Sequence, residues 1–302
     1  MTAVAEAGDD AAVPAARPRH LIVTVYGLYA RSAGGWLSVA ALIRLLADLG
    51  VDEPAVRSAI SRLKRRGILE SKRQNGQAGY ELSTEAVAIL GEGDARIFRR
   101  ERATLADGWL LAVFSVPESE RHRRHVLRSE LTKLGFGMAA PGVWIVPAHR
   151  DDTTAGMLRR LGLDAYADLF HANHFAFGDL VQKVRRWWDL DELERHYQQF
   201  LRSHEPALKR WRRRTATPGG ASGVGCADGS PDIDRAAFAD YVRALTDWRR
   251  LPYLDPGLPA ELLPEGWAGV RAAEMFFALR SRLAEPAGAH VARVLAQLGQ
   301  PR

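Results

Sequence analysis

Cationic and hydroxyl-bearing side chains gather in one segment near the N-terminus. Between Asp52 and Tyr80 the sequence holds seven Lys or Arg residues and three Asp or Glu residues. Arg can donate two hydrogen bonds to a guanine edge, Ser can bond a base or a phosphate, and Lys neutralises phosphate charge. The segment therefore predicts a surface for double-stranded DNA. The predicted contacts are Arg57, Ser58, Ser61, Arg62 and Arg65 for the major groove, Lys64 and Arg66 for phosphates, and Lys72, Arg73, Gln74 and Gln77 for the backbone or the adjacent minor groove.

Helical periodicity supplies the element that positions the groove-facing side chains. Residues 54–66 carry an apolar stripe opposite the Arg and Ser residues, formed by Val56, Ala59, Ile60 and Leu63. Asp52 is the predicted N-cap of this helix, and Pro54 suits its first turn. A preceding helix is predicted to start after Ser38, another N-cap, and to end at Gly50.

A basic hairpin is predicted to follow the second helix. Polarity alternates over residues 68–73, a polar turn spans residues 74–77, and residues 80–82 return as the partner strand. One further helix is predicted before these elements, over residues 19–30, and another after them, from Thr84 to Leu90. This order is that of a winged helix-turn-helix. The alternative is a two-helix packing unit whose charged face is only solvated.

After residue 96 the pattern of apolar residues changes, and the new pattern predicts a ferredoxin-like domain. Dense apolar or aromatic runs predict strands, and amphipathic runs predict helices between them. The predicted strands lie at 109–116, 136–138, 143–146 and 166–177, and the predicted helices at 119–134 and 153–161. Strand, helix, two strands, helix and strand is the ferredoxin-like order.

From residue 179 onward apolar residues recur at helical spacing, which predicts a helical C-terminal region after the two mixed domains. The sequence therefore predicts an α+β multidomain protein. Its predicted parts are a disordered tail at 1–16, a winged helix-turn-helix DNA-binding domain at 17–95, a ferredoxin-like domain at 96–178, and a helical C-terminal domain at 179–302 with a flexible loop at 215–231.

One short stretch combines aromatic and cationic side chains in a way that suits a small ligand. Seven of the eight tryptophans lie outside the predicted DNA-binding region. Lys183, Arg185 and Arg186 stand beside Trp187 and Trp188, so cations for phosphates and apolar walls for a ring occur together. These five residues form the predicted effector site. The alternative is that the tryptophans belong to the core.

The remaining residues favour no enzyme chemistry. His171 and His174 are three apart, which does not place both on one face of a strand, and no cysteine or third histidine is close in sequence. The glycines of 219–225 lack the Lys-Ser/Thr of a phosphate-binding loop. No nucleophile, base and orienting group can be assembled from spacing, so we expect no metal and no cofactor.

Composition limits the class of protein and its partners. A net charge of +6 favours an anionic partner, and most of the excess lies in the predicted DNA-binding segment. Cys226 is the only cysteine, so an intrachain disulfide is impossible, which fits a reducing cytoplasm. No apolar stretch is long enough to predict a membrane span, and no signal peptide is expected.

With these regions in view, the chain over about residues 19–300 resembles the PaaX family of bacterial transcriptional repressors, which control phenylacetic acid catabolism and related aromatic pathways. The resemblance depends on four stretches. They are the helix of residues 52–63, the wing from Gly67-Ile68-Leu69 to Tyr80-Glu81-Leu82, Trp188-Asp189-Leu190 with Tyr197 and Phe200, and residues 251–264 with Trp267.

The resemblance implies a winged helix joined to a Cas2-like ferredoxin domain and a helical C-terminal domain. It also implies a homodimer that represses a phenylacetate-type operon and leaves its operator when it binds an aryl-acyl-CoA such as phenylacetyl-CoA. One alternative is a repressor that senses another acyl-CoA or a free aromatic acid. Another is a metal-dependent nuclease with a winged-helix targeting module. Against the nuclease, Ser115-Val116-Pro117-Glu118 stands where Cas2-like nucleases resemble one another in placing a metal-binding Asp.

Overall fold

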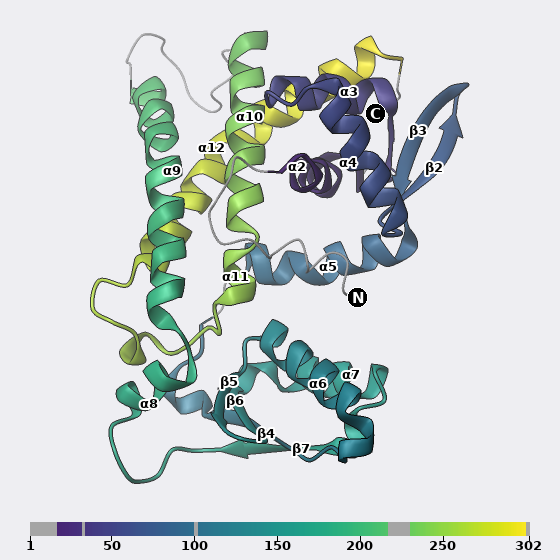
Figure 1. Ribbon diagram of the computed structural model, residues 1–302. Coiled ribbons are helices and arrows are strands. Elements are labelled where there is room, and N and C mark those ends of the chain that lie inside the picture. Colours follow the sequence, from purple (N-terminus) through teal and green to yellow (C-terminus); the bar gives the residue numbers. More distant parts are fainter. Residues whose placement is uncertain (1–16, 32–33, 100–101, 217–229, 300–302) are drawn as a thin grey trace. The chain divides into compact units, whose positions relative to one another are not determined.

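The computed structural model describes residues 17–31, 34–99, 102–216 and 230–299 (Figure 1). They belong to two compact units. Unit 1 comprises Met1–Ala95, Gln199–Arg249 and Val270–Arg302, and unit 2 comprises Arg96–Gln198 and Arg250–Gly269. These units are not the segments predicted from the sequence, whose limits stay a prediction. The predicted tail at 1–16 and residues 217–229 of the predicted loop, with Cys226, lie outside the described residues.

Unit 1 contains the winged helix-turn-helix. Its elements are α2 (Pro18–Val25), the π-helix η2 (Tyr26–Ala30), β1 (Trp36–Ser38), α3 (Val39–Asp48), α4 (Glu53–Arg65), β2 (Leu69–Gln74), β3 (Gln77–Leu82) and the unit 1 portion of α5 (Thr84–Phe98). The three strands pair antiparallel in the order β1-β3-β2. Apolar side chains from α2, α3 and α4 are fully buried, among them Ile22, Leu42, Leu45 and Val56. Burial of this apolar surface is what holds the short helices together.

Local sequence signals explain where these helices and the hairpin begin and end. The Ser38 side chain accepts a hydrogen bond from the Ala41 amide at 3.1 Å, and Asp52 accepts one from the Ala55 amide at 2.7 Å. At the hairpin tip, Asn75 and Gly76 have φ of 50° and 76°, as a two-residue turn between twisted strands requires. The predictions of the two caps and of the hairpin are confirmed.

The sequence missed one strand of this domain, and both predicted ends of the helix after the wing are wrong. Strand β1 was not predicted; it exists because its residues pair with β3, which lies far away in the sequence. The helix after the wing is capped by the Ser83 hydroxyl, which accepts from the Ala86 amide at 3.2 Å, whereas Thr84 is already helical. That helix also continues past the predicted end at Leu90 to Phe98, and Asp94 within it forms an ion pair with Arg31.

Helices from the C-terminal half complete unit 1. They are α10 (Pro231–Trp248) and the unit 1 portions of α9 (Leu190–Ala216) and α12 (Ala268–Gln297). Trp248 of α10 is fully buried and stacks on Phe276 of α12 with ring centroids 4.9 Å apart. The Thr246 hydroxyl of α10 donates to the Thr24 hydroxyl of α2 at 2.8 Å, and both side chains are buried. The helical segment thus shares its core with the winged helix.

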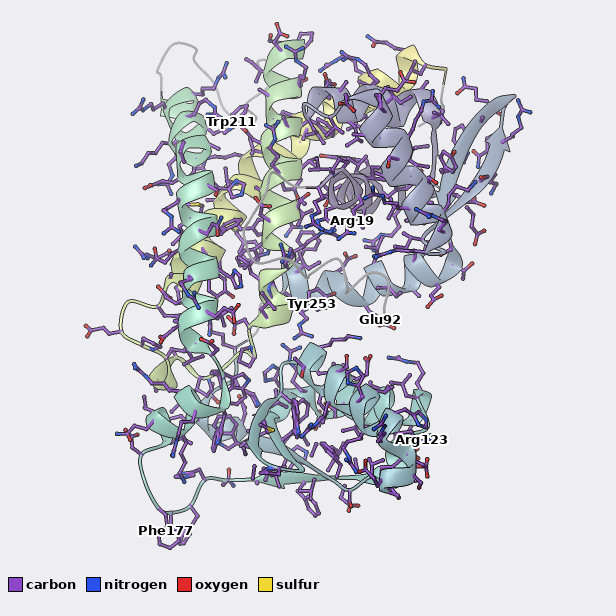
Figure 2. All side chains as sticks on the ribbon, in the orientation of Figure 1. Arg19, Glu92, Arg123, Phe177, Trp211 and Tyr253 are labelled. Atoms are coloured by element: carbon purple, nitrogen blue, oxygen red, sulfur yellow. The ribbon has the colours of Figure 1, made fainter. Side chains whose placement is uncertain are left out.

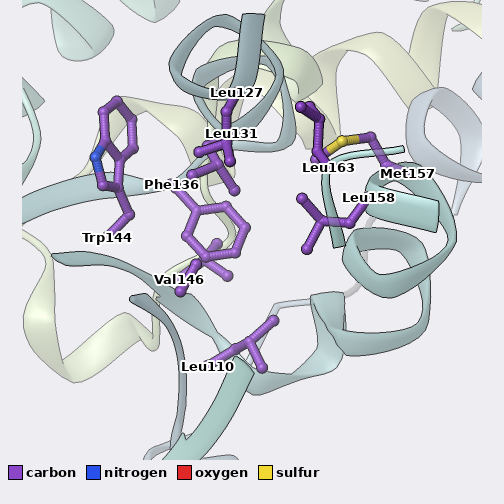
Figure 3. Packing of buried hydrophobic residues seen from close by; sticks show 10 residues of the cluster. Leu110, Leu127, Leu131, Phe136, Trp144, Val146, Met157, Leu158 and Leu163 are labelled. Atoms are coloured by element: carbon purple, nitrogen blue, oxygen red, sulfur yellow. The ribbon is translucent and has the colours of Figure 1, made fainter. Parts of the chain in front are cut away.

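Unit 2 has the predicted ferredoxin-like order. Its elements include β4 (Trp109–Phe114), α6 (Arg121–Leu134), β5 (Gly137–Ala140), β6 (Val143–Pro147), α7 (Asp151–Arg160), β7 (Ala167–Ala172), α8 (Leu180–Trp187) and α11 (Leu251–Leu254). The four strands form an antiparallel sheet in the order β5-β6-β4-β7. Helices α6 and α7 cover one face of the sheet and contribute Leu127, Leu131, Met157 and Leu158 to a core with Leu110, Phe136, Trp144 and Val146 (Figures 1 and 3). The strand predicted over residues 166–177 ends at Ala172.

A buried carboxylate fixes the proline-rich connector of residues 251–264 within unit 2. Asp255 is 3% exposed and accepts hydrogen bonds from the Tyr197 hydroxyl at 2.8 Å and from Arg102 at 3.2 Å. Arg96 donates from Nε to the Pro252 carbonyl at 2.9 Å, and burial lowers its pKa to about 10. The connector residues that carry the family resemblance therefore have a structural role.

Candidate nucleic-acid interface

Helix α4 presents its polar side chains to solvent, as the periodicity predicts. Val56, Ala59, Ile60 and Leu63 are buried against the rest of the winged helix. On the opposite side, all the residues predicted to contact DNA from α4 and its C-cap are exposed: Arg57, Ser58, Ser61, Arg62, Lys64, Arg65 and Arg66. The solvated face is long enough to enter a major groove, which admits an α-helix.

Most cations on this surface have no carboxylate partner among the residues that the structure describes. Arg57 pairs with Glu53 at 2.6 Å, and Lys72 pairs with Glu81 at 2.5 Å. Among the described residues, no salt bridge engages the other cations of the surface, which are Arg62, Lys64, Arg65, Arg66 and Arg73. Unneutralised cations on one face attract a polyanion, and their attraction to DNA is strengthened by the release of counterions.

Two hydrogen bonds from buried aromatic side chains tie the wing to the rest of the winged helix-turn-helix. The Trp36 indole donates to the Lys72 carbonyl at 3.1 Å, and the Tyr26 hydroxyl donates to the Tyr80 carbonyl at 2.8 Å. Burial raises the pKa of Tyr26, so this hydroxyl keeps its proton and remains a donor. Lys72 and Arg73 are exposed, whereas Gln74 and Gln77 are half-buried, and Gln77 already donates to the Leu298 carbonyl at 2.8 Å.

A surface hollow lies where α4, α3 and the wing meet. It has a volume of about 350 Å³. Cations, hydroxyls and apolar side chains all contribute to its lining, which consists of Arg57, Lys64, Arg65, Ser61, Tyr80, Val39 and Ile60. The Lys64 ammonium stands 5.6 Å from the centre of the Tyr80 ring. Tyr80 is a feature that the sequence interpretation missed, because it regarded this residue only as part of the return strand.

The predicted effector residues lie together at α8 in unit 2, but the two indoles have packing contacts. The rings of Trp187 and Trp188 lie 6.1 Å apart, and each is within 6.2 Å of Trp109. Trp188 also donates to the Gly135 carbonyl at 2.9 Å. Arg185 and Arg186 are exposed, and Lys183 is half-buried with its ammonium 3.0 Å from His174 Nε2. A role of these five residues in effector binding stays a prediction.

Two phenylalanines in the loop before α8 were missed by the sequence interpretation. Phe175 is 97% exposed and Phe177 is 91% exposed, in the loop between β7 and α8. Figure 2 shows Phe177 at the tip of that loop, pointing away from unit 2. Phe177 also has a φ of 67°, which is rare for a bulky residue and marks local strain. The sequence placed both rings in the strand predicted over residues 166–177.

The side chains that could suggest a metal site or a nuclease, His171 and Glu118, form ion pairs with other residues. His171 pairs with Asp151 at 3.3 Å, and Glu118, after the first strand of the ferredoxin-like sheet, pairs with Arg124 at 3.0 Å. Within the described ranges, no group of three or more His, Cys, Asp or Glu side chains is placed to hold a metal ion. No helix in the same ranges has the length and apolar character needed to cross a bilayer.

The geometry defines a class: a winged helix-turn-helix protein with an attached ferredoxin-like unit and C-terminal helices. Comparison with protein families identifies it further. Residues 17–86 match the family described as PaaX-like protein, residues 102–184 match the PaaX protein central Cas2-like domain, and residues 188–293 match the PaaX-like protein C-terminal domain. The chain therefore belongs to the PaaX family.

Two individual proteins support this assignment. The chain is 27% identical over 279 residues to the transcriptional repressor PaaX of Escherichia coli (strain K12), which covers 90% of this chain and 82% of that protein. A solved structure of an uncharacterized protein from Mycobacterium tuberculosis has a TM-score of 0.54 and 22% identity, and covers 92% of this chain and 99% of that one. The second comparison shows the shared fold.

Proposed function

We propose that this chain is a DNA-binding transcriptional repressor that acts in the cytoplasm and has no catalytic role. Its relative from Escherichia coli is named a transcriptional repressor. The observation that carries the proposal is the face of α4, where Arg62, Lys64 and Arg65 are exposed and unpaired with any carboxylate of the described residues. Helix α4 would lie in the major groove, and the hairpin β2–β3 would contact the flanking backbone.

Selection of duplexes from a random-sequence pool by the purified protein tests this function. A repressor of this kind enriches one sequence, and competition with a scrambled duplex then gives its specificity ratio. The logarithm of the apparent affinity should fall linearly with the logarithm of salt concentration. If no sequence is enriched and scrambled DNA competes equally well, the operator-binding role is wrong.

We further propose that the repressor is a homodimer released by an aryl-acyl-CoA such as phenylacetyl-CoA, and that it controls a phenylacetate-type operon. Support comes from family membership, from the exposed Arg185 and Arg186 of α8, and from the exposed Phe175 and Phe177 of the loop that precedes this helix. Cations suit the phosphates of coenzyme A, and exposed rings suit its aromatic or adenine groups.

A thermal-shift series distinguishes the possible effectors. Phenylacetyl-CoA, a short aliphatic acyl-CoA, free coenzyme A and phenylacetate should be compared at equal concentration. A ligand that binds only the folded protein raises the melting temperature. Stabilisation by phenylacetyl-CoA alone supports the proposal, whereas equal stabilisation by every thioester or by free phenylacetate assigns a different effector.

A further inference from the structure

We propose that the hollow between α4, α3 and the wing is a seat for one phosphate of the DNA backbone, with Lys64 and Tyr80 as its ligands. The inference rests on the proposed function, and it adds Tyr80 as a DNA-binding residue. Arg57, Ser61 and Arg65 line the same hollow. The phosphate would bind on the side of the hollow that faces the wing. The other polar side chains of α4 would then contact the major groove.

The charge of the hollow favours an anion. Of its three cations, Arg57 is paired with Glu53, but Lys64 and Arg65 have no carboxylate within salt-bridge distance in the described part of the chain. Val39 and Ile60 form an apolar wall. Apolar atoms in place of water lower the local dielectric constant, which strengthens the attraction between a cation and an oxyanion.

The position of Tyr80 makes its hydroxyl available as a donor. Its backbone is fixed on both sides, because Tyr80 pairs with Leu37 of β1 and with Ser71 of β2, and its carbonyl accepts from Tyr26. Its ring lies under the Lys64 ammonium at 5.6 Å. No hydrogen bond to the Tyr80 hydroxyl occurs among the described residues. Tyr80 and Lys64 therefore line the same hollow, and each carries a hydrogen-bond donor.

The start of α3 adds a third favourable contribution. Val39 is both the first residue of this helix and part of the lining of the hollow. Backbone amides at a helix N-terminus carry a partial positive charge, which favours an anion near this end of α3. The volume of about 350 Å³ is far larger than the share of one water molecule in the liquid, about 30 Å³. A phosphodiester group with its neighbouring atoms can be accommodated.

Two conservative variants and one control separate a phosphate contact from a base contact. Lys64→Gln removes the charge, and Tyr80→Phe removes only the hydroxyl while it keeps the ring that packs under Lys64. Arg271→Gln is the control, because Arg271 is an exposed cation on α12 of the same unit. Affinity is measured by fluorescence anisotropy at several salt concentrations, with a duplex that the wild-type protein has selected from a random pool and with a scrambled duplex.

For a phosphate contact, Lys64→Gln makes the negative slope of log affinity against log salt shallower by about 0.9, the value for one phosphate of B-DNA. Tyr80→Phe weakens binding roughly 3- to 10-fold, as expected for one lost hydrogen bond, with the slope unchanged. Both variants weaken the selected and the scrambled duplex by the same factor, because a phosphate carries no sequence information. Arg271→Gln changes neither quantity.

Methylphosphonate substitution, which removes the charge of one phosphate at a time, supplies the decisive readout. In the wild-type complex several positions should weaken binding, and in Lys64→Gln one of these positions in each half-site should have no further effect. An unchanged slope in Lys64→Gln, or a loss confined to the selected duplex, would overturn the phosphate seat while the repressor function stands. A wild-type protein that selects no duplex would contradict the repressor function and the seat together.

Discussion

Arg62 is the single side chain whose loss should affect DNA binding most cleanly. It is exposed on α4 and forms no salt bridge among the described residues, so removing it disturbs little of the fold. If it bonds a guanine edge, Arg62→Ala should weaken binding to the selected duplex by about 1–3 kcal/mol and relax specificity at one base pair. Gel-shift titration measures the affinity, and thermal unfolding should show unchanged stability.

The matched control for this variant is Arg271→Ala on α12, which removes the same charge from another exposed position. Equal losses of affinity in the two variants would mean that Arg62 contributes only to the general electrostatic attraction. An unchanged affinity in Arg62→Ala would remove it from the interface altogether.

Gly79 in strand β3 is a residue for which packing, and not backbone conformation, requires glycine. A Cβ at this position would lie 2.5 Å from the Leu37 carbonyl oxygen and 2.5 Å from the Trp36 ring. Gly79→Ala should therefore destabilise the winged helix by about 1–3 kcal/mol, because strand β1 would have to move. Urea unfolding measures this change.

Gly91, in the interior of α5, provides the opposite case. A Cβ there meets no atom within 4 Å. Gly91→Ala should stabilise the protein by about 0.4–1 kcal/mol, because alanine restricts the unfolded chain more than glycine does. If both substitutions had the same sign, the close contact at Gly79 would not determine its effect.

Residue types alone predicted much of the candidate interface but not all of it. The polar residues between Arg57 and Arg66 lie exposed on one face of α4. Their exposure follows from the 3.6-residue period, which can be read directly from the sequence. Tyr80 was missed because its importance depends on where Lys64 comes to lie, a contact across elements that no local pattern encodes. Phe175 and Phe177 were missed because an aromatic run reads as a buried strand until its pairing partner is known.

At the level of elements, the N-cap Asp52 contributes to the stability of α4, the helix predicted to enter the major groove. Asp52 accepts a hydrogen bond from the Ala55 amide at 2.7 Å. Asp52→Ala should cost about 1 kcal/mol of stability, and Asp52→Asn, which keeps a capping oxygen, should cost much less. Thermal unfolding of the two variants measures the difference; equal losses would show that the capping oxygen is not what matters at this position.

The boundaries of the elements could be predicted from the sequence only where local residues determine them. The caps at Ser38 and Asp52 are local, so the starts of α3 and α4 were predictable. Strand β1 forms through pairing with residues more than 40 positions away, and α5 extends to Phe98 beyond its two glycines. Tertiary contacts such as the ion pair between Asp94 and Arg31 offset the weak helix propensity there.

For the whole molecule, dimerisation would appear in the DNA sequence that the protein selects. A two-fold symmetric repressor binds two copies of one half-site in inverted orientation, with centres about 10–10.5 base pairs apart or a multiple of that distance. We expect selected duplexes to contain such an inverted repeat and light scattering to report two chains per duplex. A single unrepeated site bound by one chain would show that the protein reads DNA as a monomer.

Release from DNA by an effector requires that the two ligands oppose each other, and thermodynamics makes this opposition reciprocal. If phenylacetyl-CoA lowers the affinity for the selected duplex by some factor, the duplex must lower the affinity for phenylacetyl-CoA by the same factor. Calorimetric titration of the thioester into the free protein and into the complex measures one side, and anisotropy with and without the thioester measures the other. Substituting both Arg185 and Arg186 by Gln, on the exposed side of α8, should weaken thioester binding and leave DNA affinity without effector unchanged. Effector binding that is equally tight with and without DNA would mean that the thioester has no differential affinity for the two states and cannot be the releasing ligand.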